Sequence, residues 1–121
     1  MQIQMYPCRG IHYQMKMEDM VMIMNNKEEQ LDKELENIQK GLREISKVEN
    51  YLKDHNIEYE KNMIFNGIQI ATKDWDVVFH KYAYGYKNGL MEACGSICRL
   101  NEDVEGWLSA KDIIERLENN N

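Results

Sequence analysis

The most regular hydrophobic pattern in the chain runs from Asn26 to about His55. Its apolar positions are spaced 4, 3, 4, 3 and 7 residues apart, which is the a/d repeat of a coiled-coil helix. These positions are Leu31, Leu35, Ile38, Leu42, Ile45 and Leu52. Asn26 is a favourable N-cap and Glu28 places negative charge in the first turn, so we expect a helix over residues 26–55.

The length of this helix predicts that part of it meets a second molecule. At 1.5 Å per residue it measures ~43 Å, whereas a domain of this size is roughly 26 Å across. We therefore expect an oligomerisation helix whose apolar stripe packs against another copy. The alternative is an ordinary amphipathic helix that folds onto its own sheet. Gly41 inside the helix predicts a close approach by a neighbouring element.

After Asn56, a natural helix stop, the hydrophobic period changes from about 3.6 toward 2. Apolar residues alternate with polar ones from Ile57 onward, which is typical of a half-buried strand. Asn66-Gly67 is the strongest short hairpin signal in the chain, and a return strand follows it through Ile70.

Two more strands and a closing helix are predicted beyond this hairpin. A third strand covers residues 76–84, and residues 90–99 form a fourth strand or a short helix, with alternation favouring the strand. Residues 109–118 form the closing helix, capped by Ser109 in a weak capping box. The acidic stretch 101–105 is interpreted as a solvated loop.

The first 24 residues hold seven of the nine methionines. They form either a β-hairpin, with strands 2–6 and 11–15, or a leader outside the working protein.

The implied fold class is α+β in one domain, residues 1–121. A long N-terminal helix and a short C-terminal helix pack on a four-stranded antiparallel sheet over residues 56–99. The core face of the sheet carries Ile57, Tyr59, Ile68, Ile70, Val77, Phe79, Ala83, Met91, Ala93 and Ile97. The other face carries Glu58, Glu60, Gln69, Val78, His80, Tyr82, Tyr84, Glu92, Cys94 and Ser96.

Composition narrows the class of protein. The chain has 121 residues, and 15 Lys and Arg against 21 Asp and Glu give a net charge of −6. This balance argues against a general nucleic-acid binder, which needs a basic face, and against electrostatic membrane attachment. No apolar run approaches the ~20 residues of a membrane span. With three cysteines and no sign of export, we expect free thiols in a cytoplasmic protein.

Aromatic and charged side chains gather on the polar face of the sheet and in the loop 84–89. Exposed aromatic area beside convergent polar groups is typical of ligand and partner sites. The candidate binding residues are His80, Tyr82, Tyr84, Tyr86, Lys87, Glu92 and Arg99. Alternatively, the loop tyrosines pack against their own strand ends. Trp75 and Trp107 flank turns beside apolar runs and are interpreted as structural.

Catalytic and metal chemistry is weakly indicated. Cys8, His12, Cys94 and Cys98 could form a Cys₃His zinc site only if residues 90–99 were helical, so free thiols are preferred. His80 could act as a general base oriented by Glu92, but no nucleophile, carboxylate pair or phosphate loop accompanies it. No metal and no cofactor is expected.

Two segments carry a resemblance to a known family. They are His80-Lys81-Tyr82-Ala83-Tyr84-Gly85 with Gly89-Leu90-Met91-Glu92, and Val104-Glu105-Gly106-Trp107-Leu108-Ser109-Ala110-Lys111-Asp112. The region from Val77 to Ile114 resembles small phage and prophage accessory proteins that share H-x-x-S-Y-G…G-L-x-E and V-x-G-[WY]-L-T-A-x-D-V. Ala83 replaces the usual Ser and Ser109 the usual Thr. The resemblance implies a phage origin, with no established activity and no catalytic residues.

Three functions are therefore weighed. The preferred one is a non-enzymatic, oligomeric binding protein that blocks a host defence protein in the bacterial cytoplasm. The second is an oligomeric receptor that sequesters a nucleotide signal, which requires Tyr82, Tyr84, Lys87 and Arg99 to converge on a closed pocket. The third is a small hydrolase that uses His80 and Glu92.

Overall fold

The computed structural model describes residues 17–99 and 102–119. Residue contacts divide the chain into two units, residues 1–31 and 32–121, and each is described by itself. Helix α1 spans Met17–Asp54 and contributes to both units. It therefore begins before the predicted start at Asn26. Residues 17–24 are helical because methionine favours helices and Glu18 and Asp19 complement the dipole of the first turn. The predicted N-terminal hairpin, with strands 2–6 and 11–15, lies outside the described residues.

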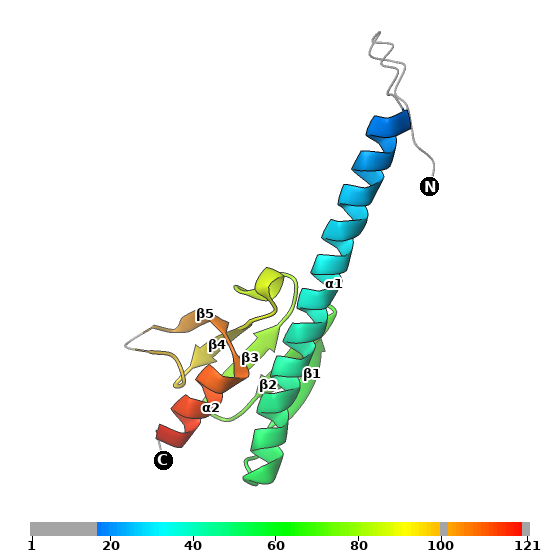
Figure 1. Ribbon diagram of the computed structural model, residues 1–121. Helices are drawn as coiled ribbons and strands as arrows, with labels where there is room; N and C mark the ends of the chain where they lie inside the picture. The colour runs from blue at the N-terminus through cyan, green and yellow to red at the C-terminus, as the bar shows by residue number, and fades with distance from the viewer. Residues whose placement is uncertain (1–16, 100–101, 120–121) are drawn as a thin grey trace. The chain divides into compact units, whose positions relative to one another are not determined.

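The second unit combines helices with an antiparallel sheet, which confirms the α+β fold class (Figure 1). Among the described residues the sheet has five strands rather than the predicted four, in the order β1-β2-β3-β4-β5. Their bounds are β1 (Glu60–Ile64), β2 (Gly67–Ala71), β3 (Trp75–Phe79), β4 (Met91–Gly95) and β5 (Val104–Leu108). A short 3₁₀ helix, η2 (Tyr86–Asn88), follows β3, and helix α2 (Ala110–Asn119) closes the chain.

The fifth strand corrects the prediction of a solvated acidic loop at its end, where Val104 and Glu105 belong to β5. Glu102 and Asp103 are exposed and outside the strand, as predicted, and residue 101 lies outside the described residues. β5 pairs antiparallel with β4, with Leu108 opposite Met91 and Val104 opposite Cys94. Part of the acidic charge that suggested solvent is neutralised, because Arg116 of α2 donates two hydrogen bonds of 2.7 Å to the Glu105 carboxylate.

Only the first half of residues 90–99 is a strand. β4 ends at Gly95, whose φ of 96° lies in the left-handed region that glycine tolerates. The following residues 96–98 form a turn, with Ser96 N–H donating to the Asp74 carbonyl at 3.1 Å. The helical alternative for this segment is therefore wrong.

The predicted hairpin at Asn66-Gly67 is present, shifted by one residue. Ile64 pairs with Gly67, so the two turn residues are Phe65 and Asn66, with φ of 47° and 58°. Two successive positive φ angles define a type I′ turn, the type that matches strand twist. Gly67 instead begins β2, where a Cβ would overlap the Phe79 carbonyl.

Helix α1 ends at Asp54, and Asn56, the helix stop that the sequence predicts, caps it in a Schellman motif. The Ile57 N–H donates to the Leu52 carbonyl at 2.9 Å and the Asn56 N–H donates to the Lys53 carbonyl at 3.2 Å. Asn56 has a φ of 55°, the left-handed conformation this cap requires. The cap turns the chain from the helix into the approach to β1.

The core of the second unit lies between one face of the sheet and the two helices. Its members are Ile45, Val48, Leu52, Ile70, Val77, Phe79, Met91, Ala93, Ile97, Leu108, Ala110 and Ile113. The predicted core face is confirmed, with Ile57, Tyr59 and Ile68 packed at its margin. Gly41 lies where the ring of Phe79 comes so close that a Cβ would overlap it, which is the close approach its position predicts.

The start of α2 is held by two carboxylates. Ser109 and Asp112 form the predicted capping box, with Asp112 N–H donating to Ser109 Oγ at 3.1 Å and Ser109 N–H donating to Asp112 Oδ2 at 2.9 Å. Glu44 of α1, itself buried, accepts from the Ala110 N–H at 3.2 Å. The two helices are thereby joined by a polar contact inside the core.

Candidate functional site

Four large aromatic side chains are exposed near the end of the sheet where β3 ends and β5 meets α2. Their exposed fractions are 60% for Phe65, 66% for Tyr82, 59% for Tyr84 and 57% for Trp107. We call these four residues the aromatic surface. Aromatic side chains bury more area on contact than any others and usually account for most of the binding energy at protein interfaces.

The first half of this surface is built on a buried histidine. The His80 ring lies 5.0 Å from that of Phe65, and Phe65 meets Tyr82 edge-on at 5.1 Å. His80 Nδ1 accepts a 3.1 Å hydrogen bond from the Tyr82 N–H, which fixes the turn after β3. The Lys81 ammonium lies 5.0 Å from the centre of the Tyr82 ring, within cation–π range.

The second half is a stacked pair. Tyr84 and Trp107 have ring centres 5.5 Å apart and nearly parallel planes, and the Trp107 N–H donates to the Tyr84 carbonyl at 3.3 Å. Gly106 makes this approach possible, because a Cβ there would overlap the Cβ of Tyr84. The Tyr84 N–H in turn donates to Glu92 Oε1 at 3.2 Å.

The two halves adjoin through one short segment. Tyr82 and Tyr84 are separated only by Ala83, which is buried. Two residues of chain span at most about 7 Å, so both aromatic pairs belong to one neighbourhood.

Two of the four aromatic residues have a strained backbone. Phe65 has a φ of 47° and Trp107 a φ of 55°. A bulky side chain is rarely found in the left-handed region, and such a conformation costs roughly 1–3 kcal/mol. Strain of this kind accumulates at functional sites. In this protein the two strained residues, Phe65 and Trp107, carry large exposed rings.

The structure brings together four of the predicted site residues and separates three. His80, Tyr82, Tyr84 and Glu92 lie in or beneath the aromatic surface. Tyr86 instead packs on the ring of Phe79 at 4.8 Å, on the core side.

The other two predicted residues, Lys87 and Arg99, contact other elements of the fold. The carbonyl of Lys87 accepts from Asn37 of α1 at 2.7 Å, because the turns at Gly85 and Gly89 direct η2 toward the helix. Arg99 follows β4 and its N–H donates to Glu105. These contacts place Lys87 at α1 and Arg99 at Glu105 of β5, and no described contact joins either residue to Tyr82 or Tyr84.

Sequence reasoning missed Phe65 and misassigned Trp107. Trp107 is exposed and stacks on Tyr84, so it belongs to the surface and does not serve the core. A bulky residue within two positions of a glycine, as in Gly106-Trp107 and Phe65-Asn66-Gly67, is the local signal that could have drawn attention to both.

The catalytic pairing of His80 with Glu92 is not supported by the contacts. Glu92 lies opposite Val78 in the sheet, and its carboxylate accepts from the Tyr84 backbone. The His80 ring is 8% exposed and accepts from the Tyr82 backbone. His80 and Val78, both predicted on the solvated face, are in fact buried, because Phe65 covers one and Val78 lies in the central strand.

The two described cysteines are free thiols. Burial raises the pKa of the Cys94 thiol to about 11, and burial also raises the pKa of Cys98. Thiols in this state are poor nucleophiles and poor metal ligands. Within residues 17–99 and 102–119, no group of His, Cys, Asp or Glu side chains could hold a metal ion.

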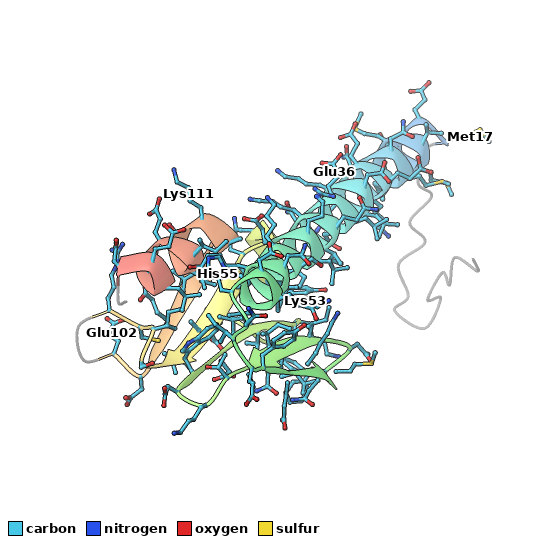
Figure 2. All side chains as sticks on the ribbon, turned by 90° about the horizontal axis from the view of Figure 1, so that it is seen from below. Met17, Glu36, Lys53, His55, Glu102 and Lys111 are labelled. Atoms are coloured by element: carbon cyan, nitrogen blue, oxygen red, sulfur yellow. The ribbon has the colours of Figure 1, made fainter. Side chains whose placement is uncertain are left out.

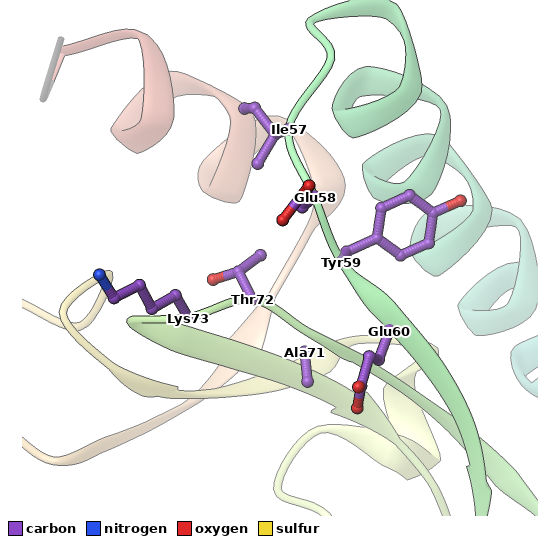
Figure 3. Close-up of a pocket in the computed structure, with 7 residues that line it drawn as sticks. All are labelled: Ile57, Glu58, Tyr59, Glu60, Ala71, Thr72 and Lys73. Atoms are coloured by element: carbon purple, nitrogen blue, oxygen red, sulfur yellow. The ribbon is translucent and has the colours of Figure 1, made fainter.

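A pocket of about 660 Å³ opens beside the start of β1 and the end of β2 (Figure 3). It is lined by Ile57, Glu58, Tyr59, Glu60, Ala71, Thr72 and Lys73. Two of its polar groups already have partners: the Tyr59 hydroxyl donates to Glu49 at 2.8 Å, and Thr72 Oγ1 donates to the Trp75 carbonyl at 2.9 Å. No predicted site residue lines this pocket.

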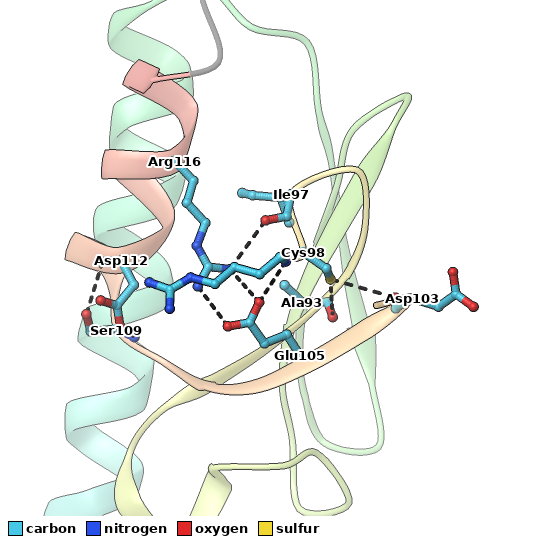
Figure 4. A network of polar contacts seen from close by, with 9 residues as sticks. Ala93, Ile97, Cys98, Asp103, Glu105, Ser109, Asp112 and Arg116 are labelled. Atoms are coloured by element: carbon cyan, nitrogen blue, oxygen red, sulfur yellow. Dashed lines mark hydrogen bonds and ion pairs between the residues drawn. The ribbon is translucent and has the colours of Figure 1, made fainter. Parts of the chain in front are cut away.

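A smaller pocket of about 370 Å³ lies between the turn after β4 and α2. Arg99 and Arg116 both line it, but the Arg116 guanidinium is bound to Glu105 (Figure 4). The hydrogen bonds from Arg116 lower the pKa of Glu105 below its ordinary value. The side chains of this pair are 13% and 18% exposed, so the network is mainly a structural connection between β5 and α2.

The predicted oligomer interface divides into exposed and buried parts. Ile45 and Leu52 belong to the protein's own core, and Ile38 packs against it. They are therefore not available to a second molecule. Leu31, Leu35 and Leu42 are exposed. Side chains surround α1 on all sides between Met17 and Glu36 (Figure 2).

Comparisons of the chain with protein-family models, with curated proteins and with solved structures found no match. The described helices also include none with the length and apolar character to cross a membrane.

Proposed function

We propose that the protein is a non-enzymatic binding protein that uses its aromatic surface to dock onto another protein. The observation that carries this proposal is the joint exposure and strain of Phe65 and Trp107. Rings that served only to pack the core would be buried. If only the positive φ mattered at these two positions, Asn or Gly would be the favoured residue.

The form of the surface favours a protein partner over a small ligand. The four rings are more than half exposed, and neither pocket reported above contains any of them. Small ligands usually enter concave pockets that cover most of their area, whereas protein interfaces use exposed aromatic anchors on flatter surfaces. Lys87 and Arg99, the cations expected beside the tyrosines, make their backbone contacts with Asn37 and Glu105 instead, and the cation that contacts a tyrosine ring of the surface is Lys81.

We also propose the partner's class. Following the resemblance to phage accessory proteins, the partner is a host defence protein in the bacterial cytoplasm, which this protein blocks by binding. The net charge of −6 suits a target with a basic surface.

Affinity capture from bacterial cells tests the proposal. The wild-type protein is compared with Tyr82→Ala and Trp107→Ala, and with Met63→Ala as the matched control. Met63 is a large apolar side chain with an exposed fraction of 84%, outside the aromatic surface. We expect one protein to be enriched by the wild type and by Met63→Ala, and to be depleted at least tenfold by either aromatic variant.

The captured protein is then purified and titrated with all four forms. A loss of affinity confined to the aromatic variants supports the assignment. Equal affinity for all four forms would show that the aromatic surface is not the binding site.

A further inference from the structure

The two halves of the aromatic surface differ in the charge beside them. On the first half, the Lys81 ammonium lies 5.0 Å from the centre of the Tyr82 ring, so this ring already faces a cation. On the second half, the Tyr84 N–H donates to Glu92 Oε1 at 3.2 Å, which places a carboxylate beside the stacked pair of Tyr84 and Trp107. Among the described residues no cation lies over either ring of this pair. The second half therefore has an anion at its edge and no cation of its own.

The Glu92 carboxylate can accept further hydrogen bonds. A carboxylate has about four acceptor positions, and the described contacts of Glu92 use one of them, for the Tyr84 N–H. Glu92 is half-buried, and none of the ion pairs within residues 17–99 and 102–119 includes it. A half-buried carboxylate without a counterion, next to exposed rings, is suited to a cationic group from a partner.

A second carboxylate adds to the negative charge on this part of the sheet. Asp76 of β3 lies opposite Cys94, and Glu92 lies opposite Val78 two positions along the same pair of strands. Burial is the main cause of the raised pKa of the Cys94 thiol, and the Asp76 and Glu92 carboxylates raise this pKa further. Asp76 accepts from Gln69 Nε2 at 3.0 Å, a neutral donor that leaves its charge uncancelled.

A guanidinium is the cation that fits both the rings and the carboxylate. It is planar and stacks on aromatic faces, and its fork of N–H donors binds a carboxylate through two hydrogen bonds. An ammonium is a compact, strongly hydrated point charge without that fork. Tyr84 supports both contacts, because its ring stacks on Trp107 and its N–H holds the Glu92 carboxylate.

We propose that the second half of the aromatic surface binds an arginine side chain of the partner protein, with the guanidinium against the Tyr84–Trp107 pair and bound to Glu92. This inference rests on the proposed function and names the chemistry of the residue that the surface receives. Arginine is enriched at binding hot spots, and a cationic anchor agrees with the net charge of −6. Lys81 disfavours a second cation beside Tyr82, so the arginine is directed to the second half.

Nuclear magnetic resonance of the full chain tests this site without the partner. The probe is N-acetyl-arginine amide at constant ionic strength, titrated to about 100 mM because a single side chain binds weakly. N-acetyl-citrulline amide, which has nearly the same shape without the charge, is the matched control probe. We expect the arginine probe to shift the indole N–H signal of Trp107 and not that of Trp75, which packs against the core. The citrulline probe should have an effect smaller by about threefold or more.

The variants Glu92→Gln and Glu58→Gln separate the site from the general charge of the chain. A glutamine amide oxygen can still accept the Tyr84 N–H, so the first variant keeps this contact. Glu58 is an exposed carboxylate outside the aromatic surface. We expect Glu92→Gln to weaken binding of the arginine probe by about threefold or more and Glu58→Gln to leave it unchanged.

Three results would overturn the proposal: no shift of the Trp107 signal, equal shifts with the arginine and citrulline probes, or equal binding of the arginine probe by the two variants. Capture of a partner through Tyr82 and Trp107 does not depend on these measurements. The arginine site can therefore fail while the proposed function holds, and the two failures are distinguishable.

Discussion

The second unit uses aromatic side chains in two opposite ways, on its core face and on the aromatic surface. On the helix side, Phe79 is 1% exposed and fits against Gly41 so closely that no Cβ could be added there. In the aromatic surface, Phe65 and Trp107 are more than half exposed and have strained backbones. A glycine permits close packing in each case. Gly41 leaves room for the Phe79 ring in the core, whereas Gly106 leaves room for Tyr84, which stacks on the exposed Trp107.

This contrast separates residues that maintain the fold from residues that are free for recognition. Burial of a phenylalanine contributes several kcal/mol, whereas an exposed one contributes little and here carries a conformational cost. Stability measurements can therefore distinguish the two faces without knowledge of any partner.

The largest expected effect comes from replacing one phenylalanine on each face. Phe79→Ala should lower the free energy of unfolding by about 3–5 kcal/mol, because it leaves a cavity in the core. Phe65→Ala should change it by less than about 1 kcal/mol, because the ring is exposed. Urea unfolding followed by circular dichroism measures both. Similar losses for the two variants would abolish the distinction between the faces.

A smaller effect is expected from filling the space at Gly41. Gly41→Ala improves helix propensity yet should cost about 1–3 kcal/mol, because the new methyl group overlaps the Phe79 ring. Adding Phe79→Leu should recover part of that loss, and Ser46→Ala on the exposed side of the same helix serves as the control. An increase in stability for Gly41→Ala would show that Phe79 does not pack as described.

The stability that the Glu105–Arg116 ion pair contributes should depend on pH. Hydrogen bonds from Arg116 lower the pKa of Glu105, so this carboxylate stabilises the fold above its unfolded pKa of about 4.3. That contribution is lost as the pH falls through the lower folded pKa. Glu105→Gln should cost about 2 kcal/mol at pH 7, and the difference from wild type should vanish in strong acid.

The control for this measurement is Glu115→Gln, whose carboxylate is 3.9 Å from Lys111 and largely exposed. Its effect should stay below about 0.5 kcal/mol at every pH. A pH-independent loss for Glu105→Gln would mean that packing, rather than charge, explains the effect.

Local signals predicted much of the fold. The Asn56 cap, the Ser109–Asp112 box and the core face follow from residues a few positions apart, and Gly41 correctly indicated a close neighbour. The fifth strand was missed because Glu105 looks solvated until Arg116, from the next element, is placed beside it. Local sequence does not contain that contact.

The candidate site was predicted only in part, again because some of its contacts join segments that are distant in the sequence. Tyr82 and Tyr84 alternate within one segment and could be assigned together, but the turns at Gly85 and Gly89 carry Tyr86 and Lys87 to the helix side. Phe65 and Trp107 join the tyrosines only through the pairing of β1 with β2 and of β4 with β5. Positions that meet across strands are not visible from spacing along the chain.

The most direct test is the free energy of unfolding of a chain that lacks the whole aromatic surface. The variant combines Phe65→Asn and Trp107→Asn, since asparagine tolerates positive φ, with Tyr82→Ser and Tyr84→Ser. Relief of strain should offset the lost ring contacts, so we predict a change of less than about 2 kcal/mol from wild type. A loss above about 4 kcal/mol would contradict the central claim, because the four rings would then be part of the fold and not free to bind a partner.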